Sequence, residues 1–169
     1  MIGLNNEQQR EGFVNQLQMA LFAWIKRHPA GDHPLGGLFV MDEAQNFAPS
    51  RRQTACLRTM LALSFQARKY GLGLVFATQA PKGLDNQIPG NAATQFYGLL
   101  NSPTQIATAN ELARVKGGTV SDISRLRAGN FYAALEGEAF HRIRAPWCLS
   151  FHPPSPLTTE EVLELSGGP

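Results

Sequence analysis

Residues 38–49 read Leu-Phe-Val-Met-Asp-Glu-Ala-Gln-Asn-Phe-Ala-Pro, an apolar run that ends in two adjacent carboxylates. Such a run is typical of a buried central strand of a parallel sheet. Neighbouring carboxylates repel each other, and burying them without cations or hydrogen bonds is costly. Mg²⁺ with nucleotide phosphates accounts for the pair, because a strand-end aspartate holds the ion through water and a following glutamate activates the attacking water. Asp42 and Glu43 are therefore candidates for these two roles.

A second apolar run, residues 72–77, also ends in polar side chains, Thr78 and Gln79. Neighbouring strands lie about 4.8 Å apart, and ligands of parallel sheets bind at the carboxyl ends of the strands. We expect Gln79 to hold the attacking water or to contact the terminal phosphate, with Thr78 beside the nucleotide. The alternative is that both residues are polar positions entering a loop.

Helical and strand-like segments alternate along the chain. Apolar spacing predicts helices over 7–27, 53–69, 103–116 and 120–127, and a last short helix after the Thr158/Glu161 capping box. Strands are expected at 38–41, 72–77 and 95–100, with a hairpin formed by 131–135 and 139–143. Phe13 and Trp24 are expected in the core, and Ser102 is expected to cap the helix that begins at Pro103.

This alternation predicts an α/β domain with a mostly parallel sheet flanked by helices and a C-terminal β-hairpin. Residues 1–152 form the predicted domain, and residues 153–169 form a proline-rich tail with a short helix.

Composition limits the class of protein. The 169 residues are 43% hydrophobic and 17% charged, with a formal net charge of +2, which favours a folded domain with a sizeable core. Cys56 and Cys148 lack paired spacing, so we expect reduced thiols in a cytoplasmic protein and no cysteine metal cluster. The sequence holds no run of about 18 apolar residues, so no membrane span is expected.

Positive charge gathers in one part of the chain. No acidic residue lies between Glu43 and Asp85, and that stretch holds Arg51, Arg52, Arg58, Arg68, Lys69 and Lys82. Such a block favours a face that meets phosphate, and the alternative is a solvated helix face. Aromatic residues do not interleave with these charges, so backbone contact is a better expectation than base stacking.

Arg68 continues the helical spacing of Leu57, Leu61 and Ser64. An arginine at this position either extends along the apolar face toward solvent or reaches into the active site of a neighbouring subunit. An arginine finger of the second kind stabilises transition-state charge.

The order of these segments resembles HerA-type DNA-translocating ATPases. Residues 38–49 are similar to their Walker B segment, and residues 67–81, Ala-Arg-Lys-Tyr-Gly-Leu-Gly-Leu-Val-Phe-Ala-Thr-Gln-Ala-Pro, to their arginine-finger and sensor segment. Leu-Asn-Ser-Pro at 100–103 and Leu-Arg-Ala-Gly-Asn-Phe at 126–131 also resemble this family, so the resemblance spans about residues 36–145. The related FtsK translocases also place an arginine before the sensor glutamine.

The resemblance implies a partial RecA-like P-loop NTPase core that uses ATP and Mg²⁺. Asp42 would be the Mg²⁺ aspartate, acting through water, with Glu43 the catalytic glutamate, Gln79 the sensor and Arg68 the trans-acting finger. The family forms rings, usually hexamers, that thread double-stranded DNA through a basic pore, and HerA proteins work with a NurA-type nuclease in DNA-end processing. Lys82 resembles a pore-loop contact, and Arg51 and Arg52 are weaker DNA-binding candidates.

One family element is missing from the sequence. No Gly-x-x-x-x-Gly-Lys-Ser/Thr occurs, so no phosphate cradle or phosphate-binding lysine is expected in these residues. The resemblance places the P-loop strand upstream in the chain and between strands 72–77 and 95–100 in the sheet. Its absence would leave unpaired apolar edges. We therefore expect the C-terminal part of an ATPase core, with weak or no ATPase activity on its own.

Two other functions fit parts of the sequence. Asp-Glu-Ala-Gln also resembles a motif of two-domain helicases, but their later arginine-rich motif does not follow Gln79. A degenerate, non-enzymatic P-loop module that binds DNA or a partner subunit is the second alternative.

Overall fold

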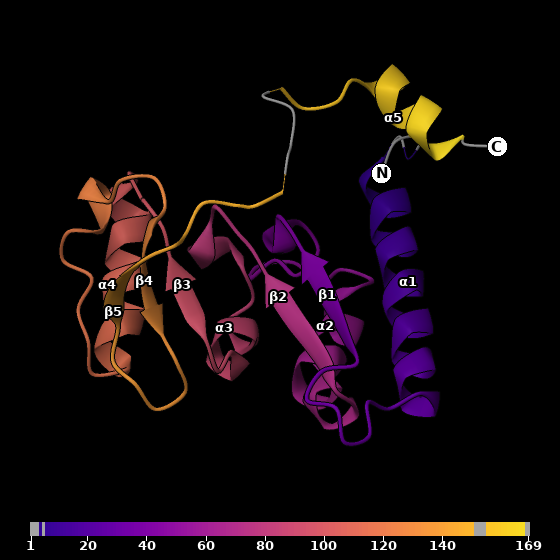
Figure 1. Cartoon of the computed structure of the whole chain (residues 1–169), viewed down its shortest axis with the longest axis horizontal. Helices are drawn as coiled ribbons and strands as arrows, with labels where there is room; N and C mark the ends of the chain where they lie inside the picture. Colours follow the sequence, from indigo (N-terminus) through magenta and orange to yellow (C-terminus); the bar gives the residue numbers. More distant parts are fainter. Residues whose placement is uncertain (1–3, 5, 151–154, 168–169) are drawn as a thin grey trace.

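The computed structural model describes residues 4, 6–150 and 155–167 and has a mixed α/β fold, which confirms the predicted class (Figure 1). Its helices are α1 (Glu7–Arg27), α2 (Leu57–Gln66), α3 (Gln87–Asn91), α4 (Pro103–Val115) and α5 (Thr159–Ser166). Its strands are β1 (Gly37–Met41), β2 (Leu72–Phe76), β3 (Gln95–Tyr97), β4 (Asn130–Ala134) and β5 (His141–Arg144).

The strands form two separate sheets. β1 and β2 pair in parallel, with Leu38 opposite Gly73 and Val40 opposite Val75. β3, β4 and β5 pair antiparallel in that order, so the hairpin is confirmed and β3 joins it. Within the described residues no pairing links β2 to β3, and each strand keeps an unpaired edge toward the other. The expected free edges are therefore present.

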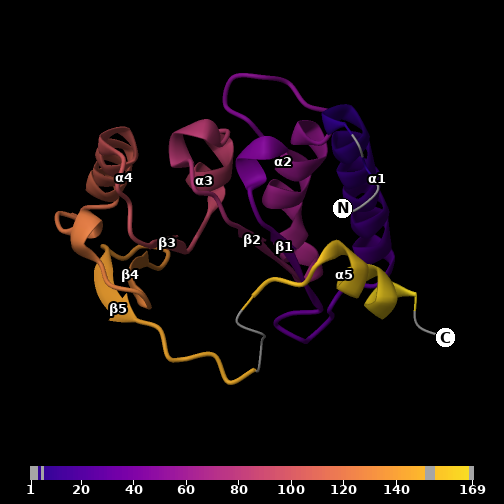
Figure 2. The same ribbon diagram turned by 90° about the horizontal axis from the view of Figure 1, so that it is seen from above.

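The helices gather on one side of the strands. Viewed from above, α2, α3 and α4 follow one another along the same face, and α1 closes the β1 side (Figure 2). Alternate residues of β1 and β2 point into this layer, where Phe39 and Met41 of β1 and Leu74 and Phe76 of β2 pack against buried residues of the helices. Removal of these apolar side chains from water holds the layer together.

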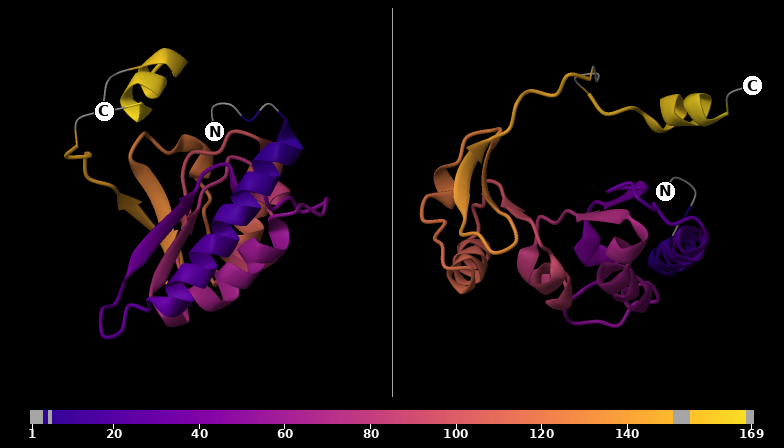
Figure 3. Two further views of the ribbon diagram at one scale, coloured as in Figure 1. Left: turned by 90° about the vertical axis from the view of Figure 1, so that its right-hand side faces the viewer. Right: turned by 60° about the horizontal axis from the view of Figure 1, so that its bottom comes forward.

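The opposite face of the strands is uncovered apolar surface. Leu38, Val40, Val75 and Phe96 are 59%, 58%, 44% and 60% exposed. We call these four residues the bare sheet face. The C-terminal segment and α5 lie on this side, but no residue of α5 is buried (Figure 3). Parallel sheets normally have both faces covered, so half of the usual layering is absent from the described residues.

Helix α1 has the expected ends but a different buried face. The Asn6 side chain accepts a hydrogen bond from the Gln9 backbone, which confirms the predicted cap. Phe13 and Trp24 are half exposed, so their predicted place in the core is wrong. Val14 and Ile25 are buried instead, because α1 lies beside β1 and turns only its inner stripe toward the core.

Helix α2 is shorter than predicted. It begins at Leu57, whose backbone N–H donates to Thr54 Oγ1 at 3.1 Å. After Gln66 the chain tightens into a 3₁₀ turn, and Gly71 ends it with a φ of 76°, in the left-handed region that glycine adopts without strain. The helix predicted over 120–127 is only the 3₁₀ turn Ile123–Arg125.

Two helix starts differ in their chemistry. Thr158 and Glu161 form the predicted reciprocal capping box of α5. Ser102 occupies the N-cap position of α4, but its side chain makes no capping hydrogen bond, so that part of the prediction is wrong.

Across the described residues, no helix combines the length and hydrophobicity that a membrane crossing requires.

Candidate active site

The chain turns sharply where β1 ends. Ala77 N–H donates to Met41 O and Ala44 N–H donates to Ala77 O, both at 2.9 Å, so the strand ends stay paired. Between them, Glu43 adopts a left-handed backbone with φ 50° and ψ 43°, and the 3₁₀ turn Ala44–Asn46 follows. Such a conformation costs a non-glycine residue on the order of 1–2 kcal/mol and concentrates at functional sites.

The turn aims the Glu43 side chain at the end of β2. Gln79 Nε2 donates to Glu43 Oε1 and Gln45 Nε2 donates to Glu43 Oε2, each at 2.5 Å. The expectation that Glu43 and Gln79 lie together is therefore confirmed. Thr78 Oγ1 in turn donates to Gln45 Oε1 at 2.5 Å, so both predicted polar pairs belong to one network. Sequence reasoning missed Gln45, although it stands two residues after Glu43 in the quoted motif.

Asp42 lies beside this network in an exposed position. Its Oδ1 accepts the Glu43 backbone N–H at 2.8 Å, and Asp42 and Glu43 both line a cavity of about 480 Å³ next to the start of α1. The described residues contain no group of three metal-ligating side chains. Mg²⁺ held together with nucleotide phosphates requires only one or two carboxylates, and an exposed aspartate at a strand end fits that requirement.

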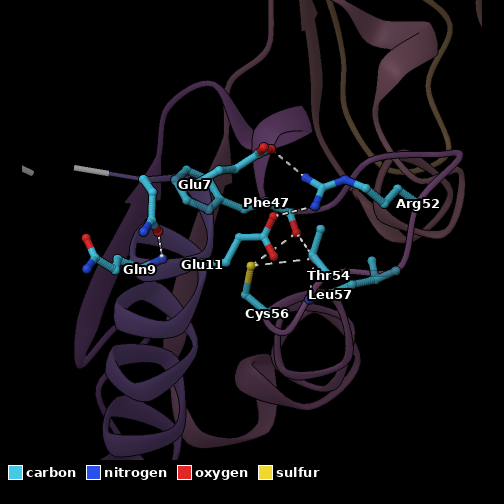
Figure 4. A network of polar contacts seen from close by, with 9 residues as sticks. Glu7, Gln9, Glu11, Phe47, Arg52, Thr54, Cys56 and Leu57 are labelled. Atoms are coloured by element: carbon cyan, nitrogen blue, oxygen red, sulfur yellow. Dashed lines mark hydrogen bonds and ion pairs between the residues drawn. The ribbon is translucent and has the colours of Figure 1, made fainter. Parts of the chain in front are cut away.

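Arg52 forms ion pairs with two residues of α1, Glu7 and Glu11, which line this cavity (Figure 4). Its guanidinium contacts Glu7 Oε1 at 2.6 Å and the buried Glu11 carboxylate at 2.7 Å. The hydrogen bond to Glu11 raises the pKa of Arg52. Because two carboxylates already engage this guanidinium, its charge serves the attachment of α1 to the loop after β1.

A buried cluster fixes the segment that follows Glu43 (Figure 4). Thr54 Oγ1 donates to the Phe47 carbonyl oxygen, and Cys56 Sγ donates to the same oxygen at 3.2 Å. Burial raises the pKa of the Cys56 thiol, which favours the neutral S–H donor. The 3₁₀ turn carrying Gln45 is thereby tied to the first turn of α2.

The segment that carries Thr78 and Gln79 is held from a second helix. Gln105 of α4 donates its amide Nε2 to the backbone oxygen of Gln79. The Ala80 backbone N–H donates to Thr78 Oγ1 at 3.0 Å. Thr78 also lines a groove of about 250 Å³ between β2 and β3, together with Val75 and Phe96. The end of β2 thus contacts α4 beside the groove that separates the two sheets.

Two of the three candidate DNA contacts lie together. Arg51 and Lys82 line a shared hollow of about 370 Å³. The loops that carry them are paired, since Ser50 Oγ donates to Lys82 O at 3.0 Å and Ser50 N–H donates to Gly83 O at 2.8 Å. Both are exposed, whereas Arg52 is turned toward α1.

Arg68 lies at the opposite end of β2. It follows α2 in the 3₁₀ turn, so it does not continue the helical stripe predicted from Leu57. Its side chain is 89% exposed and lies 3.7 Å from Glu136, beside a cavity of about 520 Å³. Ten residues lie between Arg68 and Gln79, and the five of them that form β2 span about 17 Å at 3.3 Å per residue.

Comparisons with known proteins give a structural likeness only. No protein-family model and no curated protein matches the sequence. The fold is similar to the genome packaging NTPase B204 from Sulfolobus turreted icosahedral virus 2 in complex with ATP-gammaS, with TM-score 0.63 and 15% identity over 87% of this chain and 65% of that chain. The complex with AMPPCP gives 0.61 and 16% over 81% and 62%.

A third solved structure has a weaker likeness. The DNA-packaging ATPase B204 from Sulfolobus Turreted Icosahedral Virus matches with TM-score 0.51 and 14% identity over 65% of this chain and 52% of that chain. The chain thus spans less than two thirds of the length of these solved structures. At such low identity the likeness establishes the fold alone, which is part of a P-loop ATPase-like fold.

Proposed function

We propose that this chain is the catalytic edge of a P-loop ATPase that acts on double-stranded DNA, in the manner of HerA-type translocases. The observation that carries the proposal is the hydrogen bond between Gln79 and Glu43, made across the ends of two parallel strands. It brings a carboxylate and an amide to one edge of the sheet, where phosphoryl transfer requires a base and a sensor of the terminal phosphate.

Each residue has a part in hydrolysis under this proposal. Glu43 accepts a proton from the attacking water, and Gln79 orients that water from the neighbouring strand. Asp42 would hold the Mg²⁺ of the nucleotide through water, with Thr78 beside the nucleotide at the groove. The bound ion would neutralise charge on the transferred phosphoryl group.

The phosphate-binding loop is assigned to another stretch of polypeptide. The unpaired edges of β2 and β3 and the groove between them support its entry at this point. A strand there would restore pairing to both edges. Within these 169 residues, ATP hydrolysis is then expected to be weak or absent.

Arg68 is assigned a role on a second copy of the chain. A span of about 17 Å along β2 exceeds the reach of an arginine side chain, so Arg68 does not contact the Glu43 site of its own chain. Its exposure leaves it accessible to a neighbour. This geometry supports a ring of subunits, and we take the hexamer of the resembled family as the expected form, with a NurA-type nuclease as its expected partner.

DNA is assigned to the hollow formed by Arg51 and Lys82. Both side chains are exposed cations on paired loops at the catalytic edge, so they would contact backbone phosphates without reading sequence. In the complete gene product, Lys82→Ala is expected to weaken the stimulation of ATPase activity by DNA.

The test of the proposed function is ATP hydrolysis by the complete gene product that contains this chain. Glu43→Gln should lower kcat by about 10²–10⁴-fold, because the base is lost. Glu111→Gln, on the exposed side of α4, is the matched control and should leave kcat unchanged. Equal rates for Glu43→Gln and the unaltered protein would contradict the proposal. Calorimetry that detects no ATP binding would favour the non-enzymatic module instead.

A further inference from the structure

Gln45 connects the two strand ends that form the candidate active site. Its amide Nε2 donates to Glu43 Oε2 and its Oε1 accepts from Thr78 Oγ1, both at 2.5 Å. One half-buried side chain therefore touches the carboxylate that follows β1 and the hydroxyl that follows β2. Both polar ends of the amide are used, so the orientation of its oxygen and nitrogen is fixed.

The backbone explains why this residue reaches the carboxylate. Glu43 has a left-handed backbone at the end of β1, and the 3₁₀ turn that follows places Gln45 beside the side chain of Glu43. Gln79 donates to the other carboxylate oxygen, so the carboxylate is held from two sides. A glutamate has several rotatable bonds, and both contacts reduce the number of rotamers that it samples.

We propose that Gln45 is a positioning residue for Glu43 and couples its orientation to the end of β2. The inference rests on the proposed function, in which Glu43 is the base. Under that proposal Gln79 faces the water and phosphate during hydrolysis, whereas both polar ends of the Gln45 side chain are engaged by Glu43 and Thr78. Loss of this contact would leave the base present but misdirected, and small displacements of reacting groups can lower rates on the order of 10²-fold.

The first experiment uses the 169-residue chain and needs no activity. Side-chain amide signals of Gln45 and Gln79 are recorded by ¹H–¹⁵N NMR, with and without Glu43→Ala. Both signals should move when the carboxylate is removed, because both amides lose their acceptor. The exposed Gln66 is the control and should keep its position. An unmoved Gln45 signal would overturn the inference.

The second experiment measures ATP hydrolysis by the complete gene product. Gln45→Met keeps the length of the side chain but has no amide, and should lower kcat about 10- to 100-fold while KM for ATP changes less than about twofold. Gln66→Met is the matched control. In a Glu43→Gln background, Gln45→Met should cause no further loss, because the residue that it positions is already inactive.

The outcomes separate this inference from the proposed function. If Glu43→Gln abolishes hydrolysis but Gln45→Met retains kcat within twofold, the positioning role fails and the proposed function stands. An equal loss from Gln45→Met in both backgrounds would mean that Gln45 acts independently of Glu43, and would also overturn the role. Full hydrolysis by Glu43→Gln would overturn both, and thermal unfolding of Gln45→Met would identify a loss caused by misfolding.

Discussion

Gln18 is a fully buried amide in the middle of α1 with no hydrogen-bond partner for either its Oε1 or its Nε2. We predict that Gln18→Met stabilises the chain. Methionine is unbranched, has a similar helix propensity and brings no polar atom into the core. An unsatisfied buried polar group costs about 1–3 kcal/mol, so the variant should gain an amount in that range.

Urea unfolding of the chain measures this gain. With a slope of about 2 kcal/mol per molar urea, the midpoint should rise by about 0.5–1.5 M at an unchanged slope. The melting temperature should rise by about 2–4 °C per kcal/mol for a chain of this size. Gln16→Met, on the exposed side of the same helix, is the control and should change the midpoint little. A lower midpoint for Gln18→Met alone would refute the reasoning, because the amide would then have a partner in solution, such as a buried water.

Three other perturbations address the basic segment, the sheet and the thiols. Arg52→Ala should lower the urea midpoint because it leaves the buried Glu11 carboxylate unpaired. Arg51→Ala should leave stability unchanged and weaken salt-dependent binding of duplex DNA. The reverse pattern would contradict the assignment of Arg52 to the attachment of α1 and of Arg51 to DNA. Burial raises the pKa of Tyr97 to about 12, so the folded state favours the neutral phenol. The free energy of unfolding should therefore fall as pH rises from 10 toward 12. Absorbance at 295 nm follows the ionisation of the phenol. Cys148 is exposed, and a hydrogen bond with Ser150 lowers its pKa, so Cys148 should react with a thiol reagent at pH 8. The buried Cys56, whose pKa is raised by burial, should react only after unfolding. Equal reaction rates of the two thiols would show that the Cys56 pocket opens.

The meeting of the two strand ends in the candidate active site was predictable because its signal is local. The apolar runs at 38–41 and 72–77 end in polar pairs, and parallel neighbours bring such ends together whatever the rest of the chain does. The contacts of Gln45 with Glu43 and Thr78 were not predictable in this way. They depend on a positive φ at Glu43, which non-glycine residues seldom adopt and which no periodicity reports.

The buried face of α1 was mispredicted for a different reason. The helix carries apolar residues on more than one stripe, so spacing alone does not tell which stripe faces the core. Phe13 and Trp24 belong to the outer stripe and Val14 and Ile25 to the inner one. Gln18 is also buried on the inner side of α1, although glutamine side chains are mostly exposed in folded proteins.

Arg68 was assigned to a helical stripe because the sequence spacing continues past the end of α2. The structure tightens into a 3₁₀ turn after Gln66, which changes the angle between successive side chains from 100° to about 120°. A spacing argument fails wherever the helix type changes. The exposed position of Arg68 at the far end of β2 follows from this turn and from Gly71 behind it.

The bare sheet face restricts how the missing layer can be built. Strand-to-strand crossovers between parallel neighbours are right-handed, and the β1–α2–β2 crossover already occupies the covered face. A segment that ran the other way, from a strand at the free edge of β2 to a position beyond β1, would be a right-handed crossover only if it crossed the bare sheet face. It would then pass over Val75 and Val40. The direction of travel of any completing segment is therefore dictated by chirality, before any particular side-chain contact is considered.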